Sequence, residues 1–375
     1  MSAAGMSGTG SYNSPRRLCI AGGGTGGHVF PALALADVVR RRWPEMSVSF
    51  IGAQRGLEAR LMPERGEQVF LLGMHSVQGA SLVQKLRVLG WELPCAVLSI
   101  MRQWRAGKPQ LLVGVGGYAS VAGVLAAFVS RIPVVLYEQN AVPGMVNRKL
   151  VRFCQRIMLG FSDAATRLPD DKVVYTGNLV SDAIRKTRRM PGKLPHLIVL
   201  GGSQGAQVLN ENLPAACRLL REAGHEFRVT HVAGSAERVP QLVDAYAGAD
   251  VNAEVLDFCR DMPSLYASAD LMLARSGAMT VCEAAAVGLP SIFVPLPHAA
   301  DNHQYLNAAS LVAAGGAMML EQRCLSAGRL AGVIGEMLFD PRRLEAMGIA
   351  ARSAQPDDSE ERMLGVLGGW LEVAA

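Results

Sequence analysis

Three glycine-rich turns, each placed directly after a short apolar segment, constrain the fold of this chain more than any other feature. They occupy residues 22–27, 114–117 and 201–205, and a stretch with helical spacing of apolar residues follows each turn. A glycine turn between a strand and a helix is typical of parallel α/β units, because the backbone turns tightly there and can approach a phosphate closely. The sequence therefore predicts an α/β protein with doubly wound, Rossmann-like sheets.

The strand–turn–helix pattern runs through the first half of the chain and restarts after residue 182. At 375 residues the chain is also longer than one ordinary hydrophobic core requires. We therefore expect two Rossmann-like domains that face one cleft, over residues 16–179 and 180–358. Residues 1–15 are interpreted as a flexible tail, and the final helix, within 359–375, is expected to return to the first domain.

Composition narrows the class of protein. Half of the residues are hydrophobic and 18% are charged, which excludes a disordered chain. The seven cysteines include no Cys-x-x-Cys pair, so we expect neither a zinc site nor a disulfide framework. The first fifteen residues lack the regions of a signal peptide, and no apolar run has the about 18–20 residues that cross a bilayer. A cytosolic location is the simplest expectation.

The charge is distributed unevenly. The net charge is +5, but residues 1–180 carry +10 and residues 181–375 carry −5. This asymmetry suggests that the first half meets an anionic partner. Charge alone leaves open nucleic acid, phospholipid, a pyrophosphate-bearing substrate and an ordinary solvated surface.

The first glycine turn matches G-x-G-x-x-G, the fingerprint of a dinucleotide-binding fold. That fingerprint also requires an acidic residue at the end of the second strand. Here the strand ends at residues 51–54, and the first acid is Glu58, which disfavours a nicotinamide-dependent oxidoreductase. His28 follows the turn at a helix start, where the neutral imidazole is favoured, and this suits a general base.

Polar residues follow three other expected strands. Glu138 and Asn140 leave the strand at 134–136, at the end where ligands bind in open α/β sheets. Ser276 is expected to cap a helix whose free amides could hold phosphate, and Glu283 lies about two turns further on. Residues 301–304 are expected to form a loop that could read sugar hydroxyls.

Six segments together resemble one family. In order they read GGGTGGH, GVGGYAS, YEQN, GGSQGA, RSGAMTVCEAAAVGLP and DNHQYLN. Over residues 16–345 they resemble the MurG family of bacterial N-acetylglucosamine transferases, which implies the GT-B fold and an inverting reaction. N-acetylglucosamine would pass from UDP-GlcNAc to the C4 hydroxyl of undecaprenyl-pyrophosphoryl-MurNAc-pentapeptide (lipid I), giving lipid II for peptidoglycan.

The resemblance also implies roles for individual residues. His28 and Glu138 both remain candidates for the catalytic base, and no cofactor or metal is implied because helix N-termini can stabilise a leaving diphosphate. The GlcNAc would contact the first turn, Asn140 and Gln304, uracil would contact the backbone near Cys259, and diphosphate and ribose would contact the second domain. The residues expected to bind substrate are Thr25, Gly26, Gly27, Tyr118, Asn140, Ser203, Gln204, Gly205, Cys259, Ser276, Ala278, Met279, Thr280, Glu283 and Gln304.

Two positions depart from the family pattern. The family has histidine before Glu-Gln-Asn, where this chain has Tyr137, and it typically has an arginine at the interdomain joint, where this chain has Ser181. That arginine is a usual donor-site contact, so either the diphosphate is bound more weakly or another cation substitutes for it. Arg185 is the substitute that the sequence suggests.

Residues 82–105 combine apolar and basic side chains, among them Lys85, Arg87, Leu89 and Trp91. Buried helices with basic flanks would explain this pattern. So would a patch that lies on the anionic inner leaflet of the cytoplasmic membrane. The lipid acceptor implied by the resemblance favours the second interpretation and a peripheral membrane location.

The resemblance gives nucleic acid no role and allows contacts with other cell-wall synthesis proteins. Two alternatives to the transferase remain. One is a UDP-GlcNAc 2-epimerase of the same fold, and the other is a sugar-nucleotide-binding regulator whose catalysis was impaired by the changes at Tyr137 and Ser181.

Overall fold

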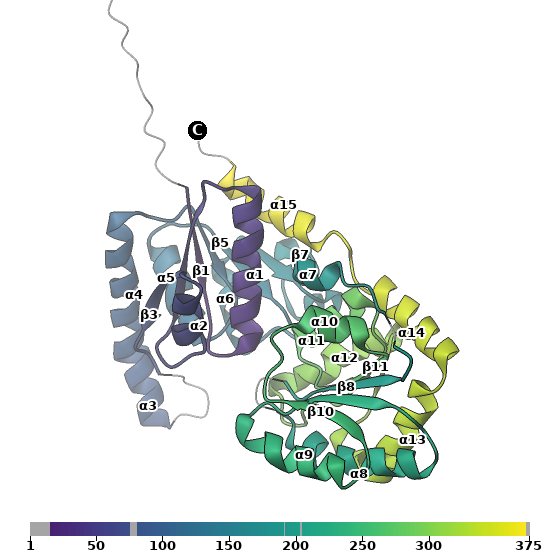
Figure 1. The fold of residues 1–375 in the computed structure, drawn as a ribbon. Helices are drawn as coiled ribbons and strands as arrows, with labels where there is room; N and C mark the ends of the chain where they lie inside the picture. Colours follow the sequence, from purple (N-terminus) through teal and green to yellow (C-terminus); the bar gives the residue numbers. More distant parts are fainter. Residues whose placement is uncertain (1–15, 76–80, 191, 203–204, 373–375) are drawn as a thin grey trace, which may run out of the picture.

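The computed structural model describes residues 16–75, 81–190, 192–202 and 205–372, so the tail expected at residues 1–15 lies outside the described residues. Two parallel sheets form two lobes (Figure 1). The first has seven strands in the order β3-β2-β1-β4-β5-β6-β7, and the second has six in the order β10-β9-β8-β11-β12-β13. The predicted α/β class with two doubly wound sheets is confirmed.

The strands of the first sheet are β1 (Arg17–Ala21), β2 (Ser47–Ala53), β3 (Gln68–Leu72), β4 (Leu111–Gly114), β5 (Val134–Glu138), β6 (Arg156–Leu159) and β7 (Val173–Tyr175). Those of the second are β8 (His196–Leu200), β9 (Arg228–Val232), β10 (Asn252–Leu256), β11 (Leu271–Ala274), β12 (Ser291–Phe293) and β13 (Ala317–Met319). The boundary that the sequence suggests at residue 180 falls between β7 and β8.

The α-helices are α1 (Gly26–Arg42), α2 (Glu58–Glu64), α3 (Leu82–Arg87), α4 (Leu93–Gln103), α5 (Tyr118–Val129), α6 (Met145–Leu150), α7 (Asp182–Arg185), α8 (Gln207–Glu222), α9 (Val239–Ala247), α10 (Met262–Ser268), α11 (Ala278–Val287), α12 (His303–Ala313), α13 (Ala327–Leu338), α14 (Pro341–Ser353) and α15 (Ser359–Leu371). A π-helical turn, η1 (Val88–Glu92), joins α3 to α4, and 3₁₀ turns include η2 (Trp104–Ala106), η6 (Ala236–Arg238) and η7 (Ala300–Asn302).

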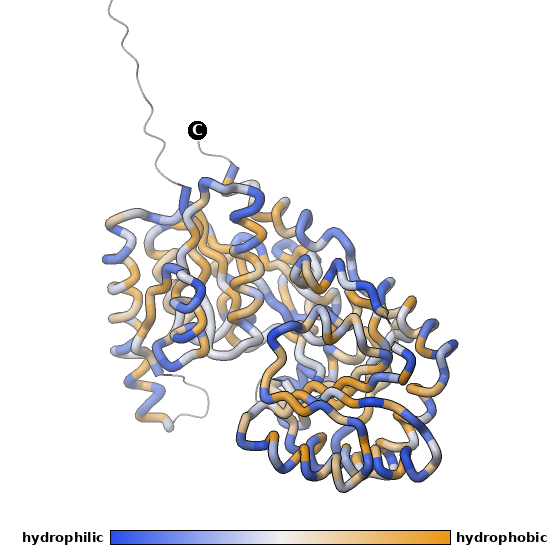
Figure 2. The backbone as a smooth tube through the Cα atoms, viewed as in Figure 1, coloured by the Kyte–Doolittle hydropathy of each residue, from blue (hydrophilic) through white to orange (hydrophobic). Residues whose placement is uncertain are grey.

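Helices cover both faces of each sheet, and the strand sequences reflect this. In β1, Leu18 and Ile20 pack in a cluster with α1 and α15, whereas Cys19 and Ala21 pack in a cluster with α4 and α5. Successive side chains of a strand point to opposite faces, so a strand covered on both faces reads as a continuous apolar run. Figure 2 shows the same pattern, with hydrophobic strands inside and hydrophilic segments outside.

The last helix packs on the first lobe, as Figure 1 shows for α15 near α1. Met363, Leu367 and Leu371 are completely buried in the cluster that contains the α1 side chains. Arg41 of α1 also forms an ion pair with Glu360 at 2.7 Å. The chain therefore passes between the lobes twice, at residues 176–182 and again at 354–359.

The sequence did not predict four strands, namely β6, β7, β10 and β13. β7 and β13 have three residues each, and β10 is an edge strand with exposed Asn252 and Glu254. A short or edge strand lacks a long apolar run, because only part of its surface meets the core. The sheet partner therefore decides β7, β10 and β13. β6 is different, because Ile157, Met158 and Leu159 are a buried apolar run that the sequence analysis overlooked.

We predict that the protein becomes less stable as the pH is lowered from 7.5 to 5. The cause is His231 in β9, which is fully buried. Its Nδ1 lies 2.8 Å from Tyr246 Oη and its Nε2 lies 3.0 Å from Asn210 Oδ1, and burial lowers its pKa to about 4. The unfolded chain, with a histidine pKa of about 6.5, takes up a proton first as the pH falls, so the folded state loses about 2 kcal/mol by pH 5 relative to pH 7.5.

Urea unfolding at pH 7.5 and pH 5 measures this term. His231→Gln should shrink the difference in unfolding free energy between the two pH values, whereas His298→Gln, at an exposed position, should leave it unchanged. An unchanged difference in His231→Gln contradicts the prediction.

Candidate active site

The residues that the sequence singled out lie at the carboxyl ends of strands in both sheets. In the first lobe they follow β1, β4 and β5, and in the second they follow β8, β11 and β12. The carboxyl ends of parallel strands share one edge of a sheet, which is where open α/β sheets bind ligands.

The first two glycine turns are in contact with each other and with His28. A Cβ on Gly117 would lie 2.3 Å from the Gly23 carbonyl oxygen, and a Cβ on Gly116 would lie 2.8 Å from His28 Cε1. The φ values are +94° at Gly116 and +78° at Gly117, a backbone conformation that residues with a side chain rarely adopt. The imidazole of His28 thus lies directly against the second turn, and its buried Nδ1 has no hydrogen-bond partner among the described residues.

Helix α1 begins beside this contact. Thr25 is the N-cap, and Gly26 and Gly27 form the first turn with His28, whose N–H donates to Thr25 O at 3.1 Å. The Thr25 side chain makes no capping hydrogen bond and is exposed. The helix N-terminus therefore offers amide groups and a hydroxyl to a ligand. Tyr118 begins α5 in the same way after the second turn, and burial raises the pKa of its hydroxyl.

A buried carboxylate holds the first turn in place. Glu58 is completely buried; its Oε2 accepts a hydrogen bond from Gly24 N at 2.8 Å and its Oε1 accepts one from Ala53 N at 2.7 Å. A Cβ on Gly23 would lie 2.1 Å from Glu58 Oε1. The first acid after β2 is thus bound to the glycine turn itself, which argues against a ribose-binding role and against the nicotinamide alternative. Sequence reasoning noted Glu58 but did not anticipate this contact.

Glu138, one of the two candidate bases, receives four hydrogen bonds. Its Oε1 accepts from Asn140 N at 3.0 Å and Asn140 Nδ2 at 3.2 Å. Its Oε2 accepts from Gly144 N and Asn147 Nδ2, both at 2.8 Å. The carboxylate is almost fully buried. These contacts order residues 138–147 and fix the side chain of Asn140.

Asn307 of α12 links the two lobes at this point. It is completely buried; its Oδ1 accepts from Ala141 N at 2.8 Å, and its Nδ2 donates to Asn140 Oδ1 and to Ser276 O, both at 3.2 Å. One side chain of the second lobe therefore holds the loop after β5 against the loop after β11. The sequence analysis missed Asn307, although it lies within the quoted segment DNHQYLN, one helical turn after Gln304.

Helix α11 presents its N-terminus to the same region. Gly277, not Ser276, is the N-cap, and Ser276 is buried with no hydrogen-bond partner for Oγ in the described structure. The expectation that Ser276 caps the helix is therefore wrong, because its side chain points into the core. The amides of Ala278, Met279 and Thr280 occupy the first turn, where intrahelical acceptors are missing and anions bind well.

Glu283 lies further along α11 and is only half-buried. Its Oε2 accepts from Tyr266 Oη at 2.8 Å, which leaves Oε1 without a hydrogen bond in the described part of the chain. Burial raises its pKa to about 7, and the tyrosine bond partly opposes this shift. The carboxyl can accept a hydroxyl, as a ribose contact requires, because Tyr266 occupies only one of its acceptor positions.

The remaining candidates are placed as follows. Gln304 lies in the first turn of α12, not in a loop as expected, and its Oε1 accepts from Leu296 N at 2.9 Å. Cys259 is half-buried between β10 and α10. Ser203 and Gln204 lie outside the described residues. Next to them, a Cβ on Gly205 would lie 2.5 Å from Arg238 Nη1, so Arg238 of η6 reaches the third glycine turn.

Comparisons with known proteins agree with this geometry. Residues 18–159 match the glycosyltransferase family 28 N-terminal domain, and residues 196–363 match its C-terminal domain. An Anaeromyxobacter protein is 40% identical over 92% of this chain and 91% of its own length, and a Magnetococcus marinus protein is 38% identical over 96% and 99%. Both are named UDP-N-acetylglucosamine–N-acetylmuramyl-(pentapeptide) pyrophosphoryl-undecaprenol N-acetylglucosamine transferase. The chain belongs to this transferase family.

Solved structures place the fold in the same group. Acinetobacter baumannii MurG is 30% identical, covers 95% of this chain and all of its own, and superimposes with a TM-score of 0.76. A Neisseria meningitidis UDP-GlcNAc 2-epimerase is 15% identical with a TM-score of 0.64, over 94% of this chain and 99% of its own, which shows a shared fold alone. The predicted GT-B fold and the glycosyltransferase class are confirmed.

Tyr137, where the family has histidine, lies in the core beneath the site. It is completely buried; its Oη donates to Asn178 Oδ1 at 2.8 Å and accepts from Leu179 N at 3.3 Å. Asn178 in turn donates to Gln139 O at 2.9 Å and to Cys282 Sγ at 3.2 Å. The tyrosine therefore joins β5 to the interdomain segment and, through Asn178, to α11. Its complete burial and these hydrogen bonds give it a structural role, which weakens one motive for an impaired enzyme.

Arg185, the suggested substitute for the family arginine missing at Ser181, already has partners within the chain. Its Nη2 donates to Asp182 Oδ1 at 3.2 Å and its Nη1 to Asp357 O at 3.3 Å. With Ala286 it lines a cavity at the C-terminal end of α11, about 13 Å from the N-terminal end of that helix. The suggestion that Arg185 acts as the substitute cation stays a prediction, and Arg238 of η6 lies against the third glycine turn instead.

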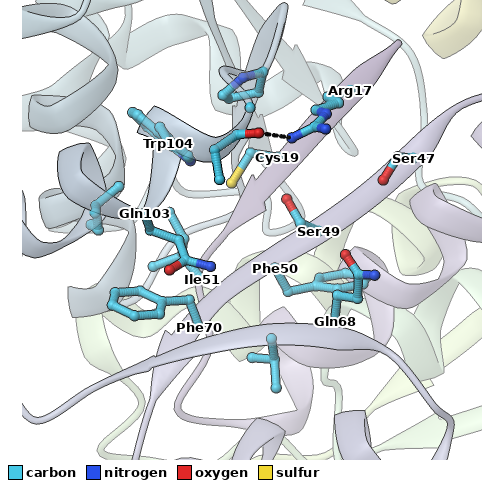
Figure 3. Close-up of a pocket in the computed structure, with 15 residues that line it drawn as sticks. Arg17, Cys19, Ser47, Ser49, Phe50, Ile51, Gln68, Phe70, Gln103 and Trp104 are labelled. Atoms are coloured by element: carbon cyan, nitrogen blue, oxygen red, sulfur yellow. Dashed lines mark hydrogen bonds between the residues drawn. The ribbon is translucent and has the colours of Figure 1, made fainter. Parts of the chain in front are cut away.

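A further cavity, of about 320 Å³, lies away from the site. Figure 3 shows Arg17, Ser47 and Gln68, with Trp104 from η2. Arg17, Ser47 and Gln68 begin or nearly begin β1, β2 and β3, so this cavity is at the amino-terminal edge of the sheet. It is opposite to the edge that carries the candidate residues.

The segment that was expected either in the core or on a membrane is largely exposed. Helix α3 has no buried residue, and Leu82, Leu86 and Trp91 are 73%, 64% and 69% exposed. The interpretation as buried helices is wrong for α3, but Val88 of η1 and Ala96 and Ile100 of α4 are buried in the core of the first lobe. No helix in the described ranges is long and apolar enough to cross a membrane, and no cluster of three metal-ligating side chains occurs in those ranges.

We predict that Glu138→Gln destabilises the protein by about 2 kcal/mol, because the amide nitrogen of glutamine would meet donors that now face a carboxylate oxygen. Urea unfolding measures the effect. Glu45→Gln, at an exposed position before β2, is the matched control and should change stability by less than about 0.5 kcal/mol. Equal stability of the two variants would show that the four hydrogen bonds do not hold the loop.

Proposed function

We propose that this transferase moves N-acetylglucosamine from UDP-GlcNAc to the C4 hydroxyl of undecaprenyl-pyrophosphoryl-MurNAc-pentapeptide, with inversion at the anomeric carbon. The observation that carries the proposal is the Asn307 bridge. It joins the loop that contains Asn140 to the loop that leads into α11. The Asn140 loop lies at the same edge of the first sheet as His28. A group for the acceptor and groups for a nucleotide diphosphate are thereby held at one junction of two lobes.

The second lobe supplies the donor site. The first-turn amides of α11 (Ala278, Met279 and Thr280) and the third glycine turn would hold the diphosphate. Arg238, beside Gly205, would add the cation that Ser181 does not provide. The carboxyl of Glu283 would accept a ribose hydroxyl, and the backbone near Cys259 would read uracil.

The first lobe supplies the acceptor side and the base. In an inverting transfer the acceptor hydroxyl loses its proton as it attacks the anomeric carbon, and UDP leaves with added negative charge. His28 has a ring nitrogen with no protein partner in the described structure, whereas both oxygens of Glu138 already accept two hydrogen bonds each. His28 is therefore the proposed base, and Glu138 positions Asn140 against the sugar.

Stabilisation of the leaving group requires no metal in this scheme. Amides at a helix N-terminus point at the diphosphate and carry partial positive charge, so negative charge that develops there is stabilised without reorganisation. The same amides hold the donor before the reaction. Asn307, which binds neither substrate directly in this scheme, sets the distance between donor and acceptor sides.

The function is tested with purified protein, labelled UDP-GlcNAc and a short-chain lipid I analogue. We expect glycosylated lipid and one UDP for each product molecule. His28→Gln should lower kcat by about 10²- to 10⁴-fold with a nearly unchanged KM for UDP-GlcNAc, while His298→Gln should match the wild type.

Three results would contradict parts of the proposal. A kcat of His28→Gln within threefold of the wild type would remove His28 as the base. UDP-GlcNAc binding without any product would indicate a regulator. Free N-acetylmannosamine or its UDP derivative would indicate the epimerase activity named for some structures of the same fold.

The lipid acceptor requires the enzyme to work at a membrane. The exposed side chains of residues 82–92, which form α3 and η1, fit this role, and we call them the α3–η1 surface. We propose peripheral attachment to the cytoplasmic face of the cell membrane through the apolar side chains of this surface and the cations Lys85 and Arg87. Arg87 also pairs with Glu92 at 3.3 Å, which offsets part of its charge. Apolar contact and attraction to anionic headgroups act together in such surfaces.

The double variant Lys85→Glu/Arg87→Glu should weaken binding to anionic phospholipid vesicles by roughly 30-fold, since each reversed charge costs about 1 kcal/mol or more. Added salt should weaken the wild type in the same direction. The control Lys108→Glu/Lys193→Glu makes the same charge change at exposed positions elsewhere. Equal vesicle binding by the two double variants would contradict the assignment of the surface.

A further inference from the structure

A cavity of about 220 Å³ lies where the chain passes between the two lobes. Residues 178–180, which lead out of the first lobe, line one side, and residues 355–357 with Ser359 and Glu360, which lead back, line the other. Gly177 allows these segments to approach, because a Cβ there would lie 2.3 Å from Ser359 Oγ and 2.7 Å from Pro356 Cγ. We refer to this space as the crossing cavity.

Three arginines line the crossing cavity: Arg185, Arg188 and Arg352. Arg188 is exposed and donates only to the neighbouring Thr187 O, at 3.3 Å. Arg352, on the last turn of α14, donates to Val287 O at the end of α11. Neither Arg188 nor Arg352 forms an ion pair with a carboxylate of the described chain, so both guanidinium charges remain uncompensated by a direct partner.

The carboxylates nearby do not cancel this charge. Glu360 lines the cavity but pairs with Arg41 at 2.7 Å. Asp182 pairs with Arg185 at 3.2 Å and with Lys186 at 3.8 Å. Asp357 is the third carboxylate. The lining itself has three arginines and two carboxylates, Asp357 and Glu360, so positive charge is in excess, and Arg188 and Arg352 are the arginines without an ion pair among the residues that the structure describes.

We infer that the crossing cavity binds a small phosphate-type anion, such as inorganic phosphate or pyrophosphate, held by Arg188 and Arg352 with Arg185. The planar guanidinium donates two parallel N–H groups and fits phosphate oxygens better than a point charge does. The volume is several times the about 30 Å³ that a water occupies in the liquid, which is enough for such an anion. A lipid is disfavoured because polar and charged side chains form most of the lining.

This site is separate from the proposed donor site. Ala286, which lines the crossing cavity, is next to the last residue of α11, whereas the donor diphosphate is assigned to the first turn of the same helix. The helix is about 13 Å long between these points. An anion in the crossing cavity touches both segments that connect the lobes, so its binding is coupled to the arrangement of the lobes.

Equilibrium dialysis of labelled pyrophosphate tests the inference, with saturating UDP present to occupy the donor site. We expect one pyrophosphate to remain bound per wild-type chain. Arg188→Gln/Arg352→Gln should weaken this binding at least tenfold, and the control Arg60→Gln/Arg218→Gln, which removes two exposed arginines elsewhere, should leave it unchanged.

Arg352 also contacts the end of α11, so the double variant could lose structure. The single variant Arg188→Gln avoids this loss of structure, because Arg188 donates a hydrogen bond only to the neighbouring Thr187 O. The single variant should weaken pyrophosphate binding at least threefold and leave the melting temperature unchanged. Loss of pyrophosphate when UDP is added, or equal affinity in Arg188→Gln, in the double variant and in the wild type, would overturn the inference. The measurement needs no transferase activity, so its outcome is independent of the proposed reaction.

Discussion

Buried side-chain acceptors hold the irregular backbone at the carboxyl ends of the strands, and the site depends on them. Loop amides in this region have no sheet or helix partner, and a buried amide without an acceptor is costly. Glu58 accepts from Gly24 and Ala53, Glu138 accepts from Asn140 and Gly144, and Asn307 accepts from Ala141. Each acceptor fixes a loop that would otherwise have several conformations. The glycines at 23, 52 and 56 leave the space that the Glu58 carboxylate occupies.

The same kind of contact joins the two lobes. Asn307 reaches from α12 to the loop after β5, and Asn178 links Tyr137 to Cys282 of α11. Ala141 and Phe161 of the first lobe also pack in the apolar cluster of the second. Buried polar networks with every member paired specify one geometry, because a shift breaks several hydrogen bonds at once. A different arrangement of the lobes would break these hydrogen bonds, and the crossing cavity, which Asn178 lines, lies beside them.

Much of the fold could be predicted from the sequence, and the failures have physical causes. Leu18–Ala21 and Leu197–Leu200 are continuous apolar runs followed by glycine turns, so both central strands and the two-domain division were recognisable. β7 and β13 were missed because three residues carry little periodicity. The first turn suggested a dinucleotide site, and only the contact between Glu58 and Gly24 explains why the acid after β2 serves another purpose. Ser276 had the right residue type for a cap, but its side chain is buried beneath the helix that Gly277 begins.

By itself, the sequence determined the class of fold, the family and the residues that gather near the site, because these depend on local patterns and on motifs in a fixed order. The tertiary structure decided what each of those residues can do. It paired Glu138 with four donors and left His28 Nδ1 without a partner among the described residues, and it placed Tyr137 in the core. It also paired Arg185 with Asp182 and brought Arg238 to Gly205. Hydrogen bonds between residues distant in the chain decide such roles, and a sequence pattern contains no information about which distant partner a side chain meets.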